Sequence, residues 1–269
     1  MFFGQDINFA TRDAKIKVDL HKMAEGRQDA TIMVAYLAQK ERTDEALLAA
    51  TAKADQLLNE IERMVAMNCT AVDIAYTPAD LYRLKREGKK AIMLGIENGY
   101  AIGKDLTNVE RFRNRGVVYM TLCHNGNNDI CGSARYNDEY IGVTPFGEQV
   151  IREMNRIGMM VDLSHAGEQT FYDTLDISSK PVVCSHSSSR ALCEPTQNMT
   201  DEQLKAIARK GGVVQVCLYS GFLRTDAPAT ICDAIEHLHH MVNIMGIEHV
   251  GIGTDFDGDG GIIGCNDSS

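Results

Sequence analysis

The chain has 269 residues, 44% of them hydrophobic, which is enough for one domain with a large core. Its formal net charge of −10 argues against a nucleic-acid-binding protein, which needs a basic surface to neutralise phosphates. No apolar run reaches the ~18 residues that would span a membrane, and the first residues lack the basic and apolar regions of a signal peptide. As it stands, the sequence predicts a cytoplasmic protein and leaves open a leader upstream of Met1.

Eight cysteines are spread along the chain without a C-x-x-C pair. Cys123, Cys184 and Cys217 lie inside apolar runs of the kind that form strands. Such cysteines are better interpreted as buried, reduced thiols than as a disulfide framework.

Short apolar runs alternate with longer amphipathic segments along the whole chain. Most of the runs lack a period of two, which is typical of strands buried on both faces of a parallel sheet that helices cover. We therefore predict an α/β fold. Its strands are expected at residues 29–37, 90–96, 117–123, 159–163, 181–185, 212–219 and 249–253.

The segments between these runs carry helix signals. Residues 44–68 place apolar side chains at steps of three and four, and 231–245 form a further helical pattern. Thr77 and Thr144, each followed by proline, mark two helix starts, and Thr200 begins a capping box. A barrel and an open doubly wound sheet both fit this alternation, but no strand is followed by the G-x-G-x-x-G of a dinucleotide-binding fold.

Polar side chains that can bind metals follow five of the predicted strands, at their C-terminal ends. In a barrel these ends gather around one mouth, where active sites are built. Each residue alone would pass for a structural histidine or a loop charge, but five together favour a divalent metal, because imidazole and carboxylate groups are its usual ligands. A metal there would lower the pKa of a bound water, and a nearby carboxylate could accept its proton. The residues are Glu97, His124, His165, His186 and Asp255.

The sequence around these residues resembles the membrane (renal-type) dipeptidase family of zinc metallopeptidases. The motifs occur in the family's order: GIENG at 95–99, YMTLCHN at 119–125, VDLSH at 161–165, SHSS at 185–188 and GIGTDFDG at 251–258. The resemblance implies a TIM-type (β/α)8 barrel with a binuclear zinc site that hydrolyses dipeptides.

The same resemblance implies a role for each residue of the predicted site. Glu97 corresponds to the carboxylate that bridges the two metals, and His165 and His186 to the other ligands of one of them. His124 resembles the histidine that contacts the substrate carbonyl and the oxyanion. Asp255 resembles the acid/base that handles the proton of the water.

The resemblance breaks at the start of the chain. The family opens with a strand carrying a His-x-Asp pair for the other metal, whereas the only N-terminal histidine here, His21, lies in a predicted helix. We therefore expect one barrel domain over residues 1–269 that is truncated at both ends, lacks the first strand and last helix, and holds one zinc ion. Its unpaired edge strands favour pairing with another chain, and the family resemblance by itself implies a homodimer. Two interpretations stay open, a fragment of the active enzyme and a weak or inactive variant.

Substrate recognition also departs from the family pattern. Gln197 stands where the family has an arginine that grips the substrate carboxylate, and a neutral amide loses the bidentate charge pairing. Arg190 is a candidate substitute, although solvation of a helix surface is its simpler role. Tyr219, at the end of its predicted strand, is either a substrate contact or a capping aromatic. Besides a dipeptidase, the sequence fits a metal-dependent amidohydrolase acting on a cyclic or N-acyl amide, or a catalytically impaired barrel that serves as a binding or assembly subunit.

Overall fold

The computed structural model describes residues 7–136 and 141–269. These residues form the strands β1 (Ala30–Tyr36), β2 (Val72–Ile74), β3 (Lys90–Glu97), β4 (Val117–Thr121), β5 (Met160–Asp162), β6 (Val183–Cys184), β7 (Val213–Cys217) and β8 (Val250–Gly253). The α-helices are α1 (Leu20–Glu25), α2 (Asp44–Met67), α3 (Pro78–Arg86), α4 (Thr107–Asn114), α5 (Pro145–Ile157), α6 (Glu168–Ile177), α7 (Asp201–Arg209), α8 (Ser220–Leu223) and α9 (Ile231–Met245). Two 3-10 helices, η1 (Gly99–Ile102) and η2 (Ile247–His249), complete the list.

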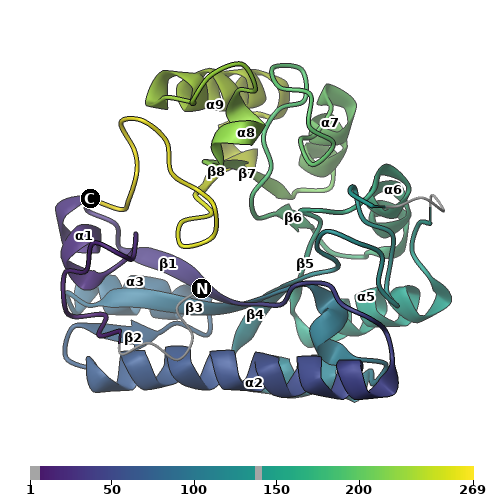
Figure 1. The fold of residues 1–269 in the computed structure, drawn as a ribbon, viewed down its shortest axis with the longest axis horizontal. Coiled ribbons are helices and arrows are strands. Elements are labelled where there is room, and N and C mark those ends of the chain that lie inside the picture. The colour runs from purple at the N-terminus through teal and green to yellow at the C-terminus, as the bar shows by residue number, and fades with distance from the viewer. Residues whose placement is uncertain (1–6, 137–140) are drawn as a thin grey trace.

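The strands form a single parallel sheet in the order β1-β3-β4-β5-β6-β7-β8, and β2 pairs with the first residues of β3. The sheet curls from β1 and β3 in the lower half of Figure 1, through β5 and β6, to β7 and β8 at the top. The fold is therefore part of a TIM-type barrel, open between β1 and β8. All seven strands predicted from the sequence are confirmed.

Helix α2 shows how the sequence fixes an element and its packing. Thr43 caps its N-terminus by accepting a hydrogen bond from the backbone N–H of Ala46, and Asp44 and Glu45 place negative charge in the first turn, where the helix dipole favours it. The helix lies along the outside of β1–β3 (Figure 1). The apolar stripe predicted from the sequence faces the core, with Leu47, Ala50, Ala54, Leu58, Ile61 and Val65 buried.

The predicted helix starts are also confirmed. Thr77 and Thr200 form capping boxes with Asp80 and Gln203, so two backbone N–H groups are satisfied reciprocally at each end. Thr144 accepts from the backbone N–H of Gly147, with proline in the first helical position. These caps fix the residue at which each of the three helices begins.

The open side of the sheet is spanned by the C-terminal segment 254–269 instead of a strand. Asp257 Oδ1 accepts a hydrogen bond from Lys17 N at 2.7 Å, and its Oδ2 accepts one from Val18 N at 3.2 Å. Ser268 N donates to Lys17 O at 3.0 Å. The C-terminal segment is therefore held by residues 17 and 18, just before α1, and the C-terminus lies beside that helix (Figure 1).

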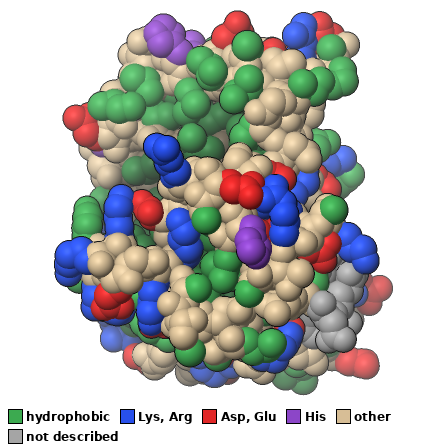
Figure 2. Space-filling model, turned by 90° about the vertical axis from the view of Figure 1, so that its left-hand side faces the viewer, with side chains coloured by type: hydrophobic (Ala, Val, Ile, Leu, Met, Phe, Trp, Pro, Cys, Tyr) green, Lys and Arg blue, Asp and Glu red, His purple; other side chains and the backbone are tan. Residues whose placement is uncertain are grey.

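Large apolar side chains are exposed next to this open side. Ile252 in β8 is 58% exposed, and in the described residues no helix follows β8 to cover it. Ile231 and Ile235 on α9, and Ile263, are also exposed. Figure 2 shows hydrophobic side chains gathered over the upper part of the molecule, which α7–α9, β7 and β8 form in Figure 1.

The remaining sequence expectations concern cysteines and membrane spans. All eight cysteines are free thiols, and Cys123, Cys184 and Cys217 are buried as predicted. In the described part of the chain, no helix has the length and apolar character needed to cross a membrane.

Candidate metal centre

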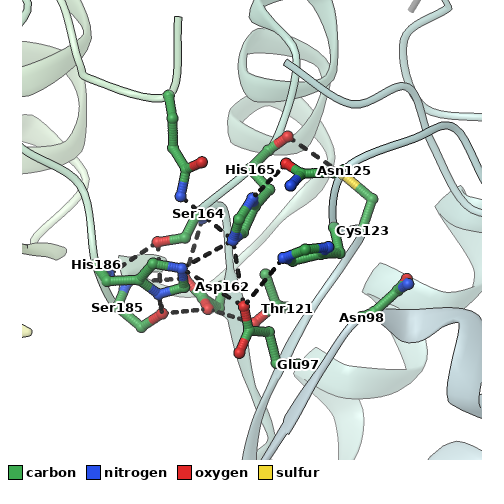
Figure 3. A network of polar contacts seen from close by, with 12 residues as sticks. Glu97, Asn98, Thr121, Cys123, Asn125, Asp162, Ser164, His165, Ser185 and His186 are labelled. Atoms are coloured by element: carbon green, nitrogen blue, oxygen red, sulfur yellow. Dashed lines mark hydrogen bonds and ion pairs between the residues drawn. The ribbon is translucent and has the colours of Figure 1, made fainter. Parts of the chain in front are cut away.

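The strand ends bring the predicted ligands together at the mouth of the barrel. Glu97 is the last residue of β3, and His165 and His186 follow β5 and β6. Figure 3 shows the three side chains pointing at one another from the ends of these strands. Because parallel strands in register carry their C-terminal ends to the same edge of the sheet, residues far apart in sequence converge here.

The three ligand atoms lie close enough to share one ion. His165 Nε2 and His186 Nε2 are 2.8 Å apart, and Glu97 Oε1 lies 3.2 Å from the first and 3.6 Å from the second. All three atoms fall within 4.8 Å of one another, and both histidines are buried.

Hydrogen bonds fix which nitrogen of His186 faces this point. Ser185 Oγ donates its single hydrogen to Asp162 Oδ2 at 2.6 Å, so it must accept from His186 Nδ1, 2.8 Å away. The neutral His186 ring therefore carries its proton on Nδ1 and presents the lone pair of Nε2 to Glu97 and His165.

Hydrogen bonds also orient the His165 ring so that its Nε2 faces the same point. Its Nδ1 lies 3.3 Å from Asn125 Oδ1, an acceptor, and the Gln197 amide nitrogen, a donor, lies 3.3 Å from its Nε2. The residue adopts a left-handed backbone with φ of 68°, which is unusual for a non-glycine residue and aims the ring back into the mouth.

Two nitrogen lone pairs and a carboxylate oxygen thus converge within 3.6 Å of one another. Nitrogen lone pairs 2.8 Å apart repel unless a proton or a cation lies between them. The donor set, two imidazoles and a carboxylate, is one that divalent transition metals prefer. The residues therefore fit a metal ion.

The pKa directions agree with a shared positive charge at this point. Burial by itself raises the pKa of Glu97, but the side-chain hydrogen bond that it shares with His165 and the charges of His186, His165 and His124 lower it to about 2. Burial lowers the pKa of His186, but the negative charges of Glu97, Asp255 and Asp162 outweigh it and raise the pKa above the usual 6.5. Burial lowers the pKa of His165. Without a metal, the proton between the rings therefore belongs to His186.

Asp162 supports the centre from below, and sequence reasoning missed it. Its Oδ1 accepts from the backbone N–H groups of Ser164 and Ser185 at 3.1 and 2.8 Å, and its Oδ2 accepts from Thr121 Oγ1 and Ser185 Oγ, both at 2.6 Å. The carboxylate ties β4, β5 and the end of β6 together (Figure 3). The available signal was a carboxylate inside the otherwise apolar run 159–163, where burial requires hydrogen-bond partners.

His124 and Asp255 lie at the same mouth. His124 Nε2 is 3.8 Å from Glu97 Oε1, and its ring packs against Tyr36 and His165 with centroids 4.9 and 4.2 Å apart. Burial lowers the pKa of His124 to about 4. Burial also raises the pKa of Asp255 to about 6, against the lowering effect of His186. The β8 backbone at Gly253, just before Asp255, is packed so closely on Ser185 O that no side chain would fit there.

The three candidate substrate residues differ in their placement. Gln197 is buried beside His165, as described. Arg190 donates from Nε to Asn198 O at 2.9 Å and from its guanidinium to Thr196 O at 2.6 Å, so it braces the loop that carries Gln197. Tyr219 is 37% exposed and packs edge-on against Phe222.

A parallel sheet curled into part of a barrel, with metal-capable side chains at the C-terminal ends of its strands, is typical of metal-dependent hydrolases built on a barrel. Comparison with known proteins narrows this class. Residues 1–269 match the model of the membrane dipeptidase family (peptidase family M19), and the chain belongs to that family. The resemblance seen in the sequence is thereby confirmed.

Individual relatives agree with this assignment. Dipeptidase tcpJ of Claviceps purpurea is 32% identical over 92% of this chain and 60% of its own length, and Dipeptidase 3 of Mus musculus is 31% identical over 95% of this chain and 51% of its own. The chain thus spans only about half to three-fifths of these curated relatives. The crystal structure of the probable dipeptidase PvdM from Pseudomonas aeruginosa superposes with a TM-score of 0.93 at 25% identity, covering 99% of this chain and 83% of that one.

Proposed function

We propose that this chain hydrolyses dipeptides with a water activated by a zinc ion at Glu97, His165 and His186. The observation that carries the proposal is the convergence of two imidazole lone pairs, 2.8 Å apart, on the Glu97 carboxylate in a member of a dipeptidase family. Three protein ligands with one open position are typical of catalytic zinc, whereas structural zinc is closed by four. When bound, a divalent metal lowers the pKa of a water to ~7 and polarises a carbonyl.

The surrounding residues supply the remaining chemistry. Asp255, with a pKa of about 6, is ionised at neutral pH. Because this pKa lies close to 7, the carboxylate can accept a proton from water and return it to the leaving amine. His124, with a pKa near 4, is neutral at pH 7 and offers one N–H to the substrate carbonyl oxygen. Glu97 stays ionised throughout, because its pKa is about 2.

The test combines metal analysis and activity on one sample. Protein purified without chelator should carry about one zinc per chain and hydrolyse simple dipeptides, and a chelator should abolish both the metal and the activity until zinc is restored. Glu97→Gln keeps the shape of the side chain but removes the charge, so this variant should lose the zinc. Glu202→Gln, the same change at a side chain that is 71% exposed, should keep it. Zinc-loaded protein that cleaves no dipeptide would overturn the proposal.

A second substrate class is favoured by one residue. Gln197 is buried at the mouth and carries no charge for a free carboxylate. A cyclic or N-acyl amide lacks the C-terminal carboxylate of a dipeptide, so a panel containing both classes decides between them. Hydrolysis of the amides alone would assign the centre to an amidohydrolase of this second kind.

A further inference from the structure

A dipeptide bound at this centre brings a negative charge that the mouth must accommodate. Glu97 and Asp255 already place two carboxyl groups there, and Gln197 is neutral. A cationic side chain at the mouth would pair with this carboxylate and favour its binding. Arg190 is occupied, because its guanidinium group holds the carbonyl groups of Thr196 and Asn198.

The loop after β4 brings a different arginine to the mouth. Ser133 Oγ donates to His124 O at 2.6 Å, and Ala134 N donates to His165 O at 2.7 Å, so the backbone just before Arg135 is fixed to two residues of the centre. Arg135 N in turn donates to Ser133 Oγ at 3.1 Å.

The same loop is tied to the segment that carries Gln197. Thr196 Oγ1 donates to Ala134 O at 3.0 Å. Gln197 follows Thr196 in sequence, and Arg135 follows Ala134. The backbones of Gln197 and Arg135 therefore lie next to each other on one wall of the mouth. The family has an arginine where this chain has Gln197, and Arg135 can supply that positive charge from the same wall.

The Arg135 side chain is available for a ligand. It is exposed, its guanidinium carbon lies 5.0 Å from the centroid of the Tyr136 ring, and within residues 7–136 and 141–269 it forms no ion pair with a carboxylate.

We propose that Arg135 binds the free C-terminal carboxylate of the dipeptide, with the Gln197 amide beside it as a neutral hydrogen-bond donor. The inference rests on the proposed dipeptidase function and assigns a specificity-determining residue to it. A guanidinium group matches a carboxylate with two parallel N–H···O bonds, which a lysine or an amide cannot reproduce. The chain therefore selects dipeptides with a free C-terminus through the loop after β4.

The test compares alanyl-alanine with its C-terminal amide in zinc-loaded protein. Arg135→Gln should raise KM for alanyl-alanine by about tenfold or more, while kcat and the KM for the amide stay within about threefold. Adding Gln197→Arg to Arg135→Gln should restore the preference for the free dipeptide, because the cation returns to the same wall. Arg209→Gln, an equal change in charge at the far end of α7, should alter neither substrate.

Equal changes for the two substrates, or no change for alanyl-alanine, would overturn the assignment of Arg135. Protein that hydrolyses neither substrate would instead count against the proposed function. Calorimetric binding of a phosphinic dipeptide mimic with a free or an amidated C-terminus then decides the inference without turnover. Tighter binding of the free acid by the parent protein, lost in Arg135→Gln, supports it, and no difference between the two mimics refutes it.

Discussion

Ser185 and Thr121 make the same hydrogen bond to Asp162 but differ in their contact with the metal centre. Each hydroxyl donates to Asp162 Oδ2 at 2.6 Å, and only Ser185 also accepts from His186 Nδ1, at 2.8 Å. The substitutions Ser185→Ala and Thr121→Val therefore remove the same bond from the carboxylate, and the first alone frees the imidazole. Comparing them separates stability from metal affinity.

The expected magnitudes follow from these contacts. Removing one hydrogen bond to a buried carboxylate costs about 2 kcal/mol of unfolding free energy, which lowers the melting temperature by about 4–8 °C in a chain of this size. Asp162 keeps three of its four donors in either variant. Ser185→Ala should also weaken zinc binding by about 10–100-fold, the usual effect of losing the partner that orients a ligating histidine.

The assay measures thermal unfolding of the metal-free variants and the zinc Kd by competition with a chelator of known affinity. Both variants should unfold at similar, lowered temperatures, and Thr121→Val should bind zinc within about twofold of the parent. If the two variants lose zinc affinity equally, the effect passes through Asp162 and the tautomer assigned to His186 is wrong.

Three further outcomes are expected. The pKa of His186 is raised above 6.5, and its proton occupies the metal position. Zinc affinity should therefore fall about tenfold per pH unit below that pKa and level off above it. Chelator competition across pH measures this, and a flat profile contradicts it. Asp255 acts as a base, so kcat/KM should rise with pH through an apparent pKa at or below about 6, since a bound cation can only lower the pKa; Asp255→Asn should reduce kcat by about 10²–10⁴-fold and abolish that limb, and an unchanged limb assigns it to another group. Leu58→Ala, at a fully buried position of α2, should cost about 2–5 kcal/mol by urea unfolding, whereas Leu48→Ala on the exposed face of the same helix should cost under about 0.5 kcal/mol; similar losses in both would refute the packing of α2.

The sequence was sufficient for most of the fold because its signals are local. Buried strands of a parallel sheet are continuous apolar runs, and each predicted run became a strand. The exception is β2, whose three residues include Asp73 between two apolar residues and give neither a run nor a clear alternation. Its position beside the first half of β3 depends on a pairing across the sheet that no local pattern encodes.

The residues of the metal centre also differ in whether a local sequence pattern predicts them. Glu97, His165 and His186 could be proposed because each follows an apolar run, which places it at the C-terminal edge. The role of Asp162 could not, because it depends on three strands being adjacent, with Thr121, Ser164 and Ser185 all reaching one carboxylate. The position of Arg135 depends on contacts between loops, which have no periodic signal.

The left-handed backbone of His165 has a consequence for evolution and engineering. A residue with a Cβ at a φ of 68° costs about 1–2 kcal/mol relative to glycine. Replacement by glycine would relieve this strain and remove a ligand in the same step. Selection for thermal stability alone would therefore drive this position away from histidine, and a library screened only for folding should be expected to discard the metal centre first.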